Sequence, residues 1–233
     1  MTIIKGDTGL IIIDPLTSSE TARAALELVH RHIGQYPVRA IIYSHTHIDH
    51  FGGARGVIGV GQPPEQNVEI IAPEGFMEHA VTENVIAGNA MGRRAMYQFG
   101  SGLAPGPEGQ MTSGIGAAVS AGTYTLIPPT RTITRTGETL TIDGVRIEFQ
   151  LTPDTEAPAE MNFFFPDLGV LCIAENATAT MHNILTPRGA LVRDTKAWAD
   201  YLTEALRLFG GRTEIMVGSH AWPRFGSDRV RDF

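Results

Sequence analysis

The sequence predicts an α/β protein in which two β-sheets pack face to face and helices cover their outer surfaces. One observation is a strand, helix, strand unit near the start, where two apolar runs flank an amphipathic segment. The other is a series of short strands and tight turns in the second half, followed by a helix and a last strand. A helix-and-strand first half and a meander-plus-helix second half are typical of two sheets lying between outer helices.

In the first half, apolar strands alternate with helices. Three consecutive isoleucines between Gly9 and Pro15 are typical of a strand that is buried on both faces. Thr17 or Ser18 can cap the helix that follows. The expected strands are 8–14, 39–43 and 68–72, and the expected helices are 18–33, 54–58 and one that begins at 73–75 and continues toward Val85.

Residues 88–129, named the excursion here, are rich in glycine, alanine and serine and have poor periodicity. One interpretation is a long surface loop with a few core contacts. The other is an apolar lid or wall over a binding site, because long loops in compact domains are often binding elements. The apolar side chains scattered through it are Met91, Met96, Tyr97, Phe99, Met111 and Tyr124.

In the second half, short strands predict an antiparallel meander, with Asp143-Gly144 as a tight hairpin turn. Asp194 is expected to cap a helix that ends at Gly210-Gly211. The expected strands are 132–134, 138–142, 145–151, 161–165, 169–173 and 214–218, and another helix is expected to open at 228.

Composition limits the function classes. A chain of 233 residues with 42% hydrophobic content can bury a full core, and we expect one domain. The formal net charge of -7 argues against a nucleic-acid or anionic-membrane surface. No apolar run approaches the roughly 20 residues that cross a bilayer, and the start carries no signal-peptide pattern. Cys172, in an apolar run, is expected to be buried.

Three imidazoles and a carboxylate follow the strand 39–43, in the segment 44–50 that we call the histidine loop. Zinc prefers imidazole nitrogen and carboxylate oxygen. His45 and His47 can reach one ion while Asp49 and His50 reach another, so the spacing predicts two metal ions. The remaining histidines, His30, His32, His79 and His182, are expected to be structural or at the surface.

Three more candidate ligands each follow a predicted strand. These are Glu156, Glu175 and His220. Taken alone, each glutamate is more simply a solvated acid, but Glu175 would be costly to bury after an apolar strand unless it were paired or bound to metal. The spacing does not distinguish Glu156 from its neighbours Asp154 and Glu160.

The H-x-H-x-D-H pattern of the histidine loop resembles the signature of the metallo-beta-lactamase fold. Five segments carry a narrower resemblance to alkyl sulfatases: 46–53, 155–161, 174–176, 181–183 and 218–223. The resemblance implies a four-layer αββα fold with two mixed sheets face to face. It also implies a single catalytic domain over 1–233 that is truncated at both ends, because the superfamily has further strands before the first one here. Alkyl sulfatases have a helical dimerisation region and a small sterol-carrier-like domain beyond this point, and both are expected to be missing here. The alternative to truncation is a minimal relative that does without them. A homodimer is a further expectation from the resemblance.

The resemblance also implies roles for individual residues. His45, His47 and Glu156 would bind one zinc ion, Asp49, His50 and His220 a second, and Glu175 would bridge the two. Other metallo-beta-lactamases have a histidine in place of Glu156 and an aspartate in place of Glu175. Asp49 and Glu175 are also the expected catalytic residues. Asn183 and Arg188 match positions that bind sulfate oxygens, with Arg193 adding more weakly to the same field.

The function that follows from the resemblance is hydrolysis of linear alkyl sulfate esters to an alcohol and inorganic sulfate by a metal-activated water. The resemblance also favours the excursion as an apolar lid for the alkyl tail. Two alternatives remain. One is another hydrolase of the same fold, acting on a lactam, thioester or phosphoester. The other is a metal-binding domain without activity. The ligand types also accept manganese or iron in place of zinc.

Overall fold

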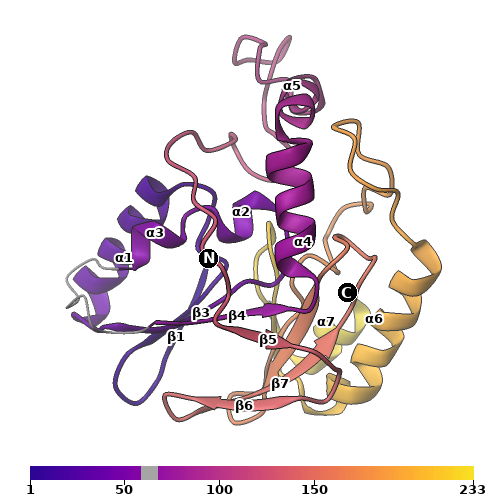
Figure 1. Ribbon diagram of the computed structural model, residues 1–233. Helices are drawn as coiled ribbons and strands as arrows, with labels where there is room; N and C mark the ends of the chain where they lie inside the picture. Colours follow the sequence, from indigo (N-terminus) through magenta and orange to yellow (C-terminus); the bar gives the residue numbers. More distant parts are fainter. Residues whose placement is uncertain (59–67) are drawn as a thin grey trace.

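The computed structural model describes residues 1–58 and 68–233, and in them two mixed sheets lie between helices (Figure 1). In the first sheet β1 (Thr2–Lys5) runs antiparallel to β2 (Leu10–Ile13) and the other pairs are parallel. In the second sheet only β9 and β10 pair in parallel among the described strands. In spatial order the first sheet is β1 (Thr2–Lys5), β2 (Leu10–Ile13), β3 (Val38–Ile42), β4 (Glu69–Pro73) and β5 (Arg131–Ile133). The second is β11 (Arg224–Phe225), β10 (Ile215–Val217), β9 (Val170–Cys172), β8 (Met161–Phe165), β7 (Val145–Leu151) and β6 (Thr139–Ile142).

Three apolar clusters define the four layers. Side chains alternate between the two faces of a strand, and Phe163 and Phe165 of β8 therefore enter the cluster between the sheets. Phe164 points the other way, into a cluster with α6 (Thr195–Phe209) and α7 (Ser227–Asp232). On the first sheet, Leu10 and Ile12 of β2 face outward and pack with residues of α1, α3 and α4. The predicted fold class, two mixed sheets face to face with outer helices, is confirmed.

The helices begin at residues with suitable caps. The Ser18 side chain accepts a hydrogen bond from the Thr21 amide at the start of α1, and Asp194 caps α6 in the same way, as predicted. In Figure 1, α1 and α3 cover the first sheet and α6 and α7 the second. The helices are α1 (Ser19–Ile33), α2 (Ile48–Phe51), α3 (Ala54–Val57), α4 (Phe76–Val81), the π-helical turn η1 (Thr82–Ile86), α5 (Gly88–Gln98), α6 (Thr195–Phe209), the 3-10 turn η2 (Gly210–Arg212) and α7 (Ser227–Asp232).

The prediction that 132–134 belongs to the antiparallel meander was wrong. This segment forms β5, which pairs in parallel with β4 at the edge of the first sheet. Thr130 fixes it there, because its hydroxyl accepts from the Ile70 amide and its amide donates to the Ile70 carbonyl. Ile133 is then fully buried between the sheets. The short strand β11, which lies at the edge of the second sheet, was not predicted.

The excursion contains more order than its composition suggested. Its first eleven residues form α5, which buries only Met91 and leaves the rest of the helix mostly in contact with solvent. No helix or strand of the described chain lies in residues 99–130. The end of the excursion is fixed to the first half, because the Thr123 amide and hydroxyl donate to Glu20 and the Thr125 amide donates to the Gly52 carbonyl.

None of the described helices has both the length and the apolar character needed to cross a bilayer.

Replacing Phe163 by alanine should remove a large part of the core between the sheets. Its ring is fully buried and packs on Phe149 and Phe165. We expect the free energy of unfolding, measured by denaturant titration, to fall by about 3 to 5 kcal/mol. The matched control is Tyr97→Ala in α5, whose side chain is 89% exposed. A loss for Phe163→Ala as small as that of the control would contradict this packing.

Candidate metal centre

The histidine loop leaves β3 at the edge where the two sheets meet. The Asp14 carboxylate, at the end of β2, accepts hydrogen bonds from the Ser44 amide at 2.8 Å and the Ser44 hydroxyl at 2.7 Å. It also accepts from Nδ1 of His50 at 2.9 Å. The loop can then turn closely past the first helix because Gly53 has no side chain, and a Cβ there would collide with the Pro15 carbonyl oxygen. Asp14 therefore fixes both the loop and the orientation of one histidine.

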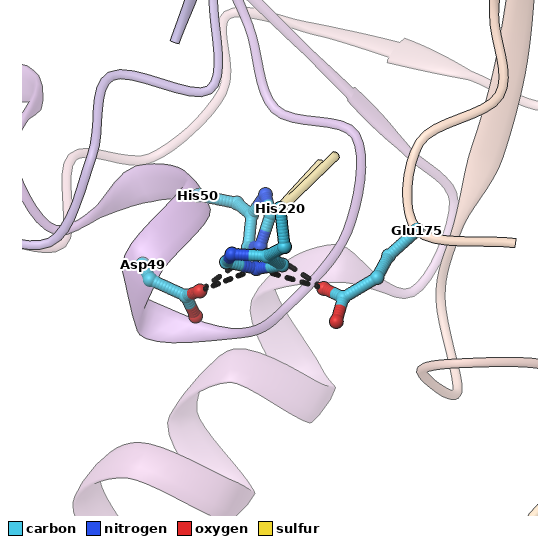
Figure 2. Close-up of side chains that lie close together, drawn as sticks. All are labelled: Asp49, His50, Glu175 and His220. Atoms are coloured by element: carbon cyan, nitrogen blue, oxygen red, sulfur yellow. Dashed lines mark ion pairs between the residues drawn. The ribbon is translucent and has the colours of Figure 1, made fainter. Parts of the chain in front are cut away.

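One group of four side chains converges at this edge (Figure 2). Asp49 Oδ2 lies 3.2 Å from Nε2 of His50 and 3.1 Å from Nε2 of His220. Glu175 Oε2 lies 3.3 Å and 3.4 Å from the same two nitrogen atoms. Asp49 and His50 lie in α2, which follows β3 of the first sheet, and Glu175 and His220 lie in the loops after β9 and β10 of the second, so both sheets contribute to the group.

A second group shares the same glutamate. His45 Nε2 lies 3.1 Å from His47 Nδ1 and 3.5 Å from Glu175 Oε2. Glu156 Oε1 lies 3.6 Å from His47 Nδ1. One carboxylate oxygen of Glu175 is thus close to histidines of both groups, which is where a residue that bridges two metal ions would have to lie.

The side chains present fit divalent metal ions. Nε2 of His50 is buried and has no hydrogen-bond partner, although its other nitrogen donates to Asp14. An imidazole whose Nδ1–H donates to a carboxylate presents a lone pair at Nε2, as in many metal sites. Imidazole nitrogens together with carboxylate oxygens are ligands that zinc accepts. The unpaired His50 nitrogen therefore points to an ion at the centre of the first group.

The charges of the site compensate one another. Burial lowers the pKa of His220, but its hydrogen bonds to Asp49 and Glu175 outweigh burial and raise that pKa to about 10. Burial raises the pKa of Asp49, but the charge of the nearby His50 and the hydrogen bond from His220 hold it well below its ordinary value. Asp49 is thus ionised at neutral pH while His220 carries a second ring proton, which an incoming cation must displace. Metal affinity should therefore fall as the pH falls.

The structure places Glu156, and neither of its two neighbours, beside His47. Asp154 is exposed. Glu160 is buried and accepts hydrogen bonds from the amides of Ala157 at 3.1 Å and Glu175 at 3.2 Å, so it supports the two loops that carry the other glutamates. Burial and the nearby Glu175 carboxylate raise the pKa of Glu156, and the Arg193 guanidinium opposes them. A metal cation would favour the ionised form in the same way.

The two arginines that the family resemblance predicts to lie near a bound sulfate have different surroundings. Arg193 is buried and pairs with Glu156 Oε2 at 2.5 Å, so it faces a candidate ligand. Arg188 lines the cavity, pairs with Glu83 and lies 2.9 Å from Nε2 of His47. Asn183 also lines the cavity, and its backbone carbonyl accepts from Arg193.

A cavity of about 1440 Å³ opens in front of the two groups. Residues of the excursion form part of its wall, and the Ile115 carbonyl accepts a hydrogen bond of 2.7 Å from Nδ1 of His220. His182, expected to be structural or at the surface, bonds to the Asn176 carbonyl at 2.9 Å and also lines this space. Apolar lining residues include Met91, Ala95, Met96, Phe99, Val119, Met181 and Trp222.

Sequence reasoning missed three groups that surround the ligands: Asp14, Glu83 and the Ile115 carbonyl. Asp14 carried a signal, because a carboxylate directly after three buried isoleucines needs a partner. For Glu83 and Ile115 the sequence contained no such signal, since each reaches the site from a segment distant in the sequence.

The backbone at several strand ends is left-handed. Asp14, Ala174 and His220 have φ values of 52°, 51° and 58°. Residues other than glycine adopt this conformation uncommonly. Each of the three either belongs to the candidate site or directly precedes one of its ligands, so the turns that aim these side chains are locally strained.

Comparison with known proteins gives a family and a set of relatives. The chain matches the profile of the metallo-beta-lactamase superfamily over residues 1–220. An (R)-specific secondary-alkylsulfatase from a Pseudomonas species is 50% identical over 234 residues, 100% of this chain and 35% of that protein. An alkyl/aryl-sulfatase of Saccharomyces cerevisiae is 48% identical over 232 residues, 100% of this chain and 36% of that protein. The chain thus spans about a third of the length of these relatives.

Solved structures agree with the fold. The stereoselective inverting sec-alkylsulfatase of Pseudomonas sp. superposes with a TM-score of 0.94 at 49% identity, over 99% of this chain and 36% of that chain. A metallo-beta-lactamase family protein of Thermus thermophilus superposes with a TM-score of 0.62 at 20% identity, over 99% of this chain and 71% of the other. The second likeness concerns the fold alone, and the predicted four-layer αββα architecture is confirmed.

Replacing His220 should impair metal binding by one group of ligands and leave the other group intact. It belongs to the group of Asp49, His50 and Glu175, whereas His45 and His47 lie in the other. Elemental analysis of His220→Ala should therefore find one metal ion fewer per chain than the unmodified protein, with the other ion retained. His32→Ala, at an exposed position of α1, is the control and should change nothing. Equal metal content in both variants would exclude His220 as a ligand.

Proposed function

Since the chain belongs to the metallo-beta-lactamase superfamily, we propose that it acts as a dinuclear zinc hydrolase that cleaves linear alkyl sulfate esters to an alcohol and inorganic sulfate. The observation that carries the proposal is the meeting of seven ligand-type side chains, six of which line one cavity together with Arg188 and a partly apolar wall. The identity of 48–50% with two sulfatases over the full chain supports this reaction above others of the same fold.

The proposed ligands divide between two ions. His45, His47 and Glu156 would bind one, Asp49, His50 and His220 the other, and Glu175 would bridge them. When bound, two zinc ions lower the pKa of a water molecule to about 7 and offset the negative charge of the sulfate.

Asp49 and Glu175 are the proposed catalytic carboxylates. Asp49 Oδ2 and Glu175 Oε2 lie on either side of His220 Nε2, at 3.1 Å and 3.4 Å. Glu175 Oε2 also lies 3.5 Å from Nε2 of His45 in the second group, and we propose that the water is held beside these two carboxylates. From there they can accept its hydrogen bonds and orient it toward the ester.

Arg188 and Asn183 are the proposed sulfate-binding residues. A guanidinium carries five N–H donors in a planar fork. The contact of Arg188 with Glu83 uses one of them, and the side chain lines the cavity. Because the chain carries a formal charge of -7, a sulfate must be attracted by such local positive charge and not by the surface as a whole.

The alkyl tail would lie against the apolar wall that the excursion and the segment around Met181 provide. Methionine side chains are flexible and pack against varied apolar shapes. Met91, Met96 and Met181 all line the cavity. We propose that residues 1–233 act as one catalytic domain, and a homodimer stays a prediction.

The test is sulfate release from dodecyl sulfate, measured together with metal content on the same sample. For Arg188→Ala we expect kcat/KM to fall by roughly 10²-fold or more, because a donor to the sulfate oxygens is lost. Arg188→Lys should fall between this variant and the unmodified protein, since lysine keeps the charge without the fork. Arg23→Ala, exposed on α1, is the matched control.

Two outcomes would count against the proposal. Unchanged turnover by Arg188→Ala at full metal content would exclude its role in sulfate binding. Two bound metal ions in the unmodified chain without any sulfate release would exclude the proposed reaction. A panel of lactam, thioester and phosphoester substrates would then separate another hydrolase from a chain that only binds metal.

A further inference from the structure

A π-helical turn lies next to the histidine loop. It is η1 (Thr82–Ile86), between α4 and α5, which rise together from the first sheet in Figure 1. Such turns are rare and often occur at functional sites. Here two consecutive side chains reach the surroundings of the loop, because Asn84 Nδ2 donates to the Thr46 carbonyl at 3.3 Å and Glu83 pairs with Arg188. The side chain of Glu83 is only 11% exposed, although it is charged.

Three of the four clustered histidines have an acceptor for the ring proton that a metal site requires. Nδ1–H of His50 donates to Asp14, that of His220 to the Ile115 carbonyl, and that of His45 to the Ser44 hydroxyl at 2.9 Å. In each of these rings Nε2 faces the other candidate ligands. Partners of this kind fix the tautomer and the orientation of ligating histidines.

His47 has the opposite orientation. Its Nδ1 faces His45 and Glu156, so a metal ion would take Nδ1 and leave the ring proton on Nε2. That proton needs an acceptor. Arg188, 2.9 Å from Nε2, has donors only. Glu83 Oε1, 3.9 Å from Nε2, is the carboxylate oxygen that the structure places on this side of the ring.

We propose that Glu83 is a positioning residue that accepts the Nε2–H of His47 and holds Arg188 beside the cavity. Its two roles would use the same carboxylate, which pairs with the guanidinium and lies 3.9 Å from Nε2 of the imidazole. Arg188 contacts Nε2 directly, so the proposal requires Glu83 to move toward His47 and to accept from this nitrogen once it is protonated. The proposal rests on the proposed metal site and deepens it, because one residue couples the metal ligand His47 to the sulfate-binding arginine.

The test is zinc affinity, measured by competition with a chromophoric chelator and without any substrate. In Glu83→Ala we expect one of the two zinc equivalents to bind roughly 10-fold to 100-fold more weakly, with the other equivalent unchanged. Glu83→Gln keeps an oxygen that can accept from Nε2–H, so it should restore zinc affinity to within a few fold. Glu78→Gln, exposed on α4 one turn earlier, is the matched control.

Kinetics with dodecyl sulfate separate the two roles. Glutamine cannot form an ion pair with Arg188, so Glu83→Gln should raise KM several fold while kcat changes little. Glu83→Ala should affect both constants. The thermal unfolding midpoint of each variant shows whether the fold has been kept, and the isosteric glutamine variant keeps the side-chain volume.

The outcomes distinguish this inference from the proposed function. Zinc affinity in Glu83→Ala equal to that of the control would overturn the inference, and so would a loss that Glu83→Gln does not restore. A chain that binds two zinc ions but releases no sulfate would refute the proposed function, while the zinc competition would still decide the role of Glu83 toward His47. A chain that takes up no zinc would overturn both.

Discussion

The contact of Glu175 with the histidines of the loop after β3 joins the two sheets at one edge, and the rest of the site is arranged around it. Glu175 follows β9 of the second sheet, whereas His45 and His50 follow β3 of the first. The backbone takes part in the same junction, because the Met161 amide donates to the Ser44 carbonyl at 3.0 Å. The core between the sheets therefore sets the distance between ligands that are far apart in the sequence. This explains why the site needs both halves of the chain.

Burial of so many charged groups is tolerated because each has a partner of opposite charge or a set of donors. Arg193 pairs with Glu156, Arg188 with Glu83, and Asp14 accepts three hydrogen bonds from the histidine loop. An isolated buried charge would cost several kcal/mol. The candidate ligands face one another, and the residues around them fix the orientation of each ligand. Loss of one side chain of a charged pair would leave the other buried without a compensating charge.

Local patterns allowed much of this to be predicted. The histidine loop could be recognised because its ligand-type residues are close in sequence. Glu156, Glu175 and His220 each follow a predicted strand, but their selection as candidate ligands depended on the family resemblance. The position of β5 could not be predicted, since a short strand gives no sign of which sheet it joins after a long excursion. The helix α5 was missed because it buries little and lacks a clear apolar stripe. Glu83 lies on a different element from the histidine loop, and only folding brings its carboxylate within 3.9 Å of His47.

The left-handed backbone at Asp14, Ala174 and His220 has a consequence for how this protein can evolve. Such conformations cost of order 1 kcal/mol or more at residues other than glycine. At Asp14 and His220 the cost is tied to side chains of the site, so heat-stable descendants cannot relieve it there without loss of the site. At Ala174 only a methyl group stands in the way, and glycine would relieve the strain while loosening the turn before Glu175. Selection for stability and selection for a rigid site therefore oppose each other at this one position.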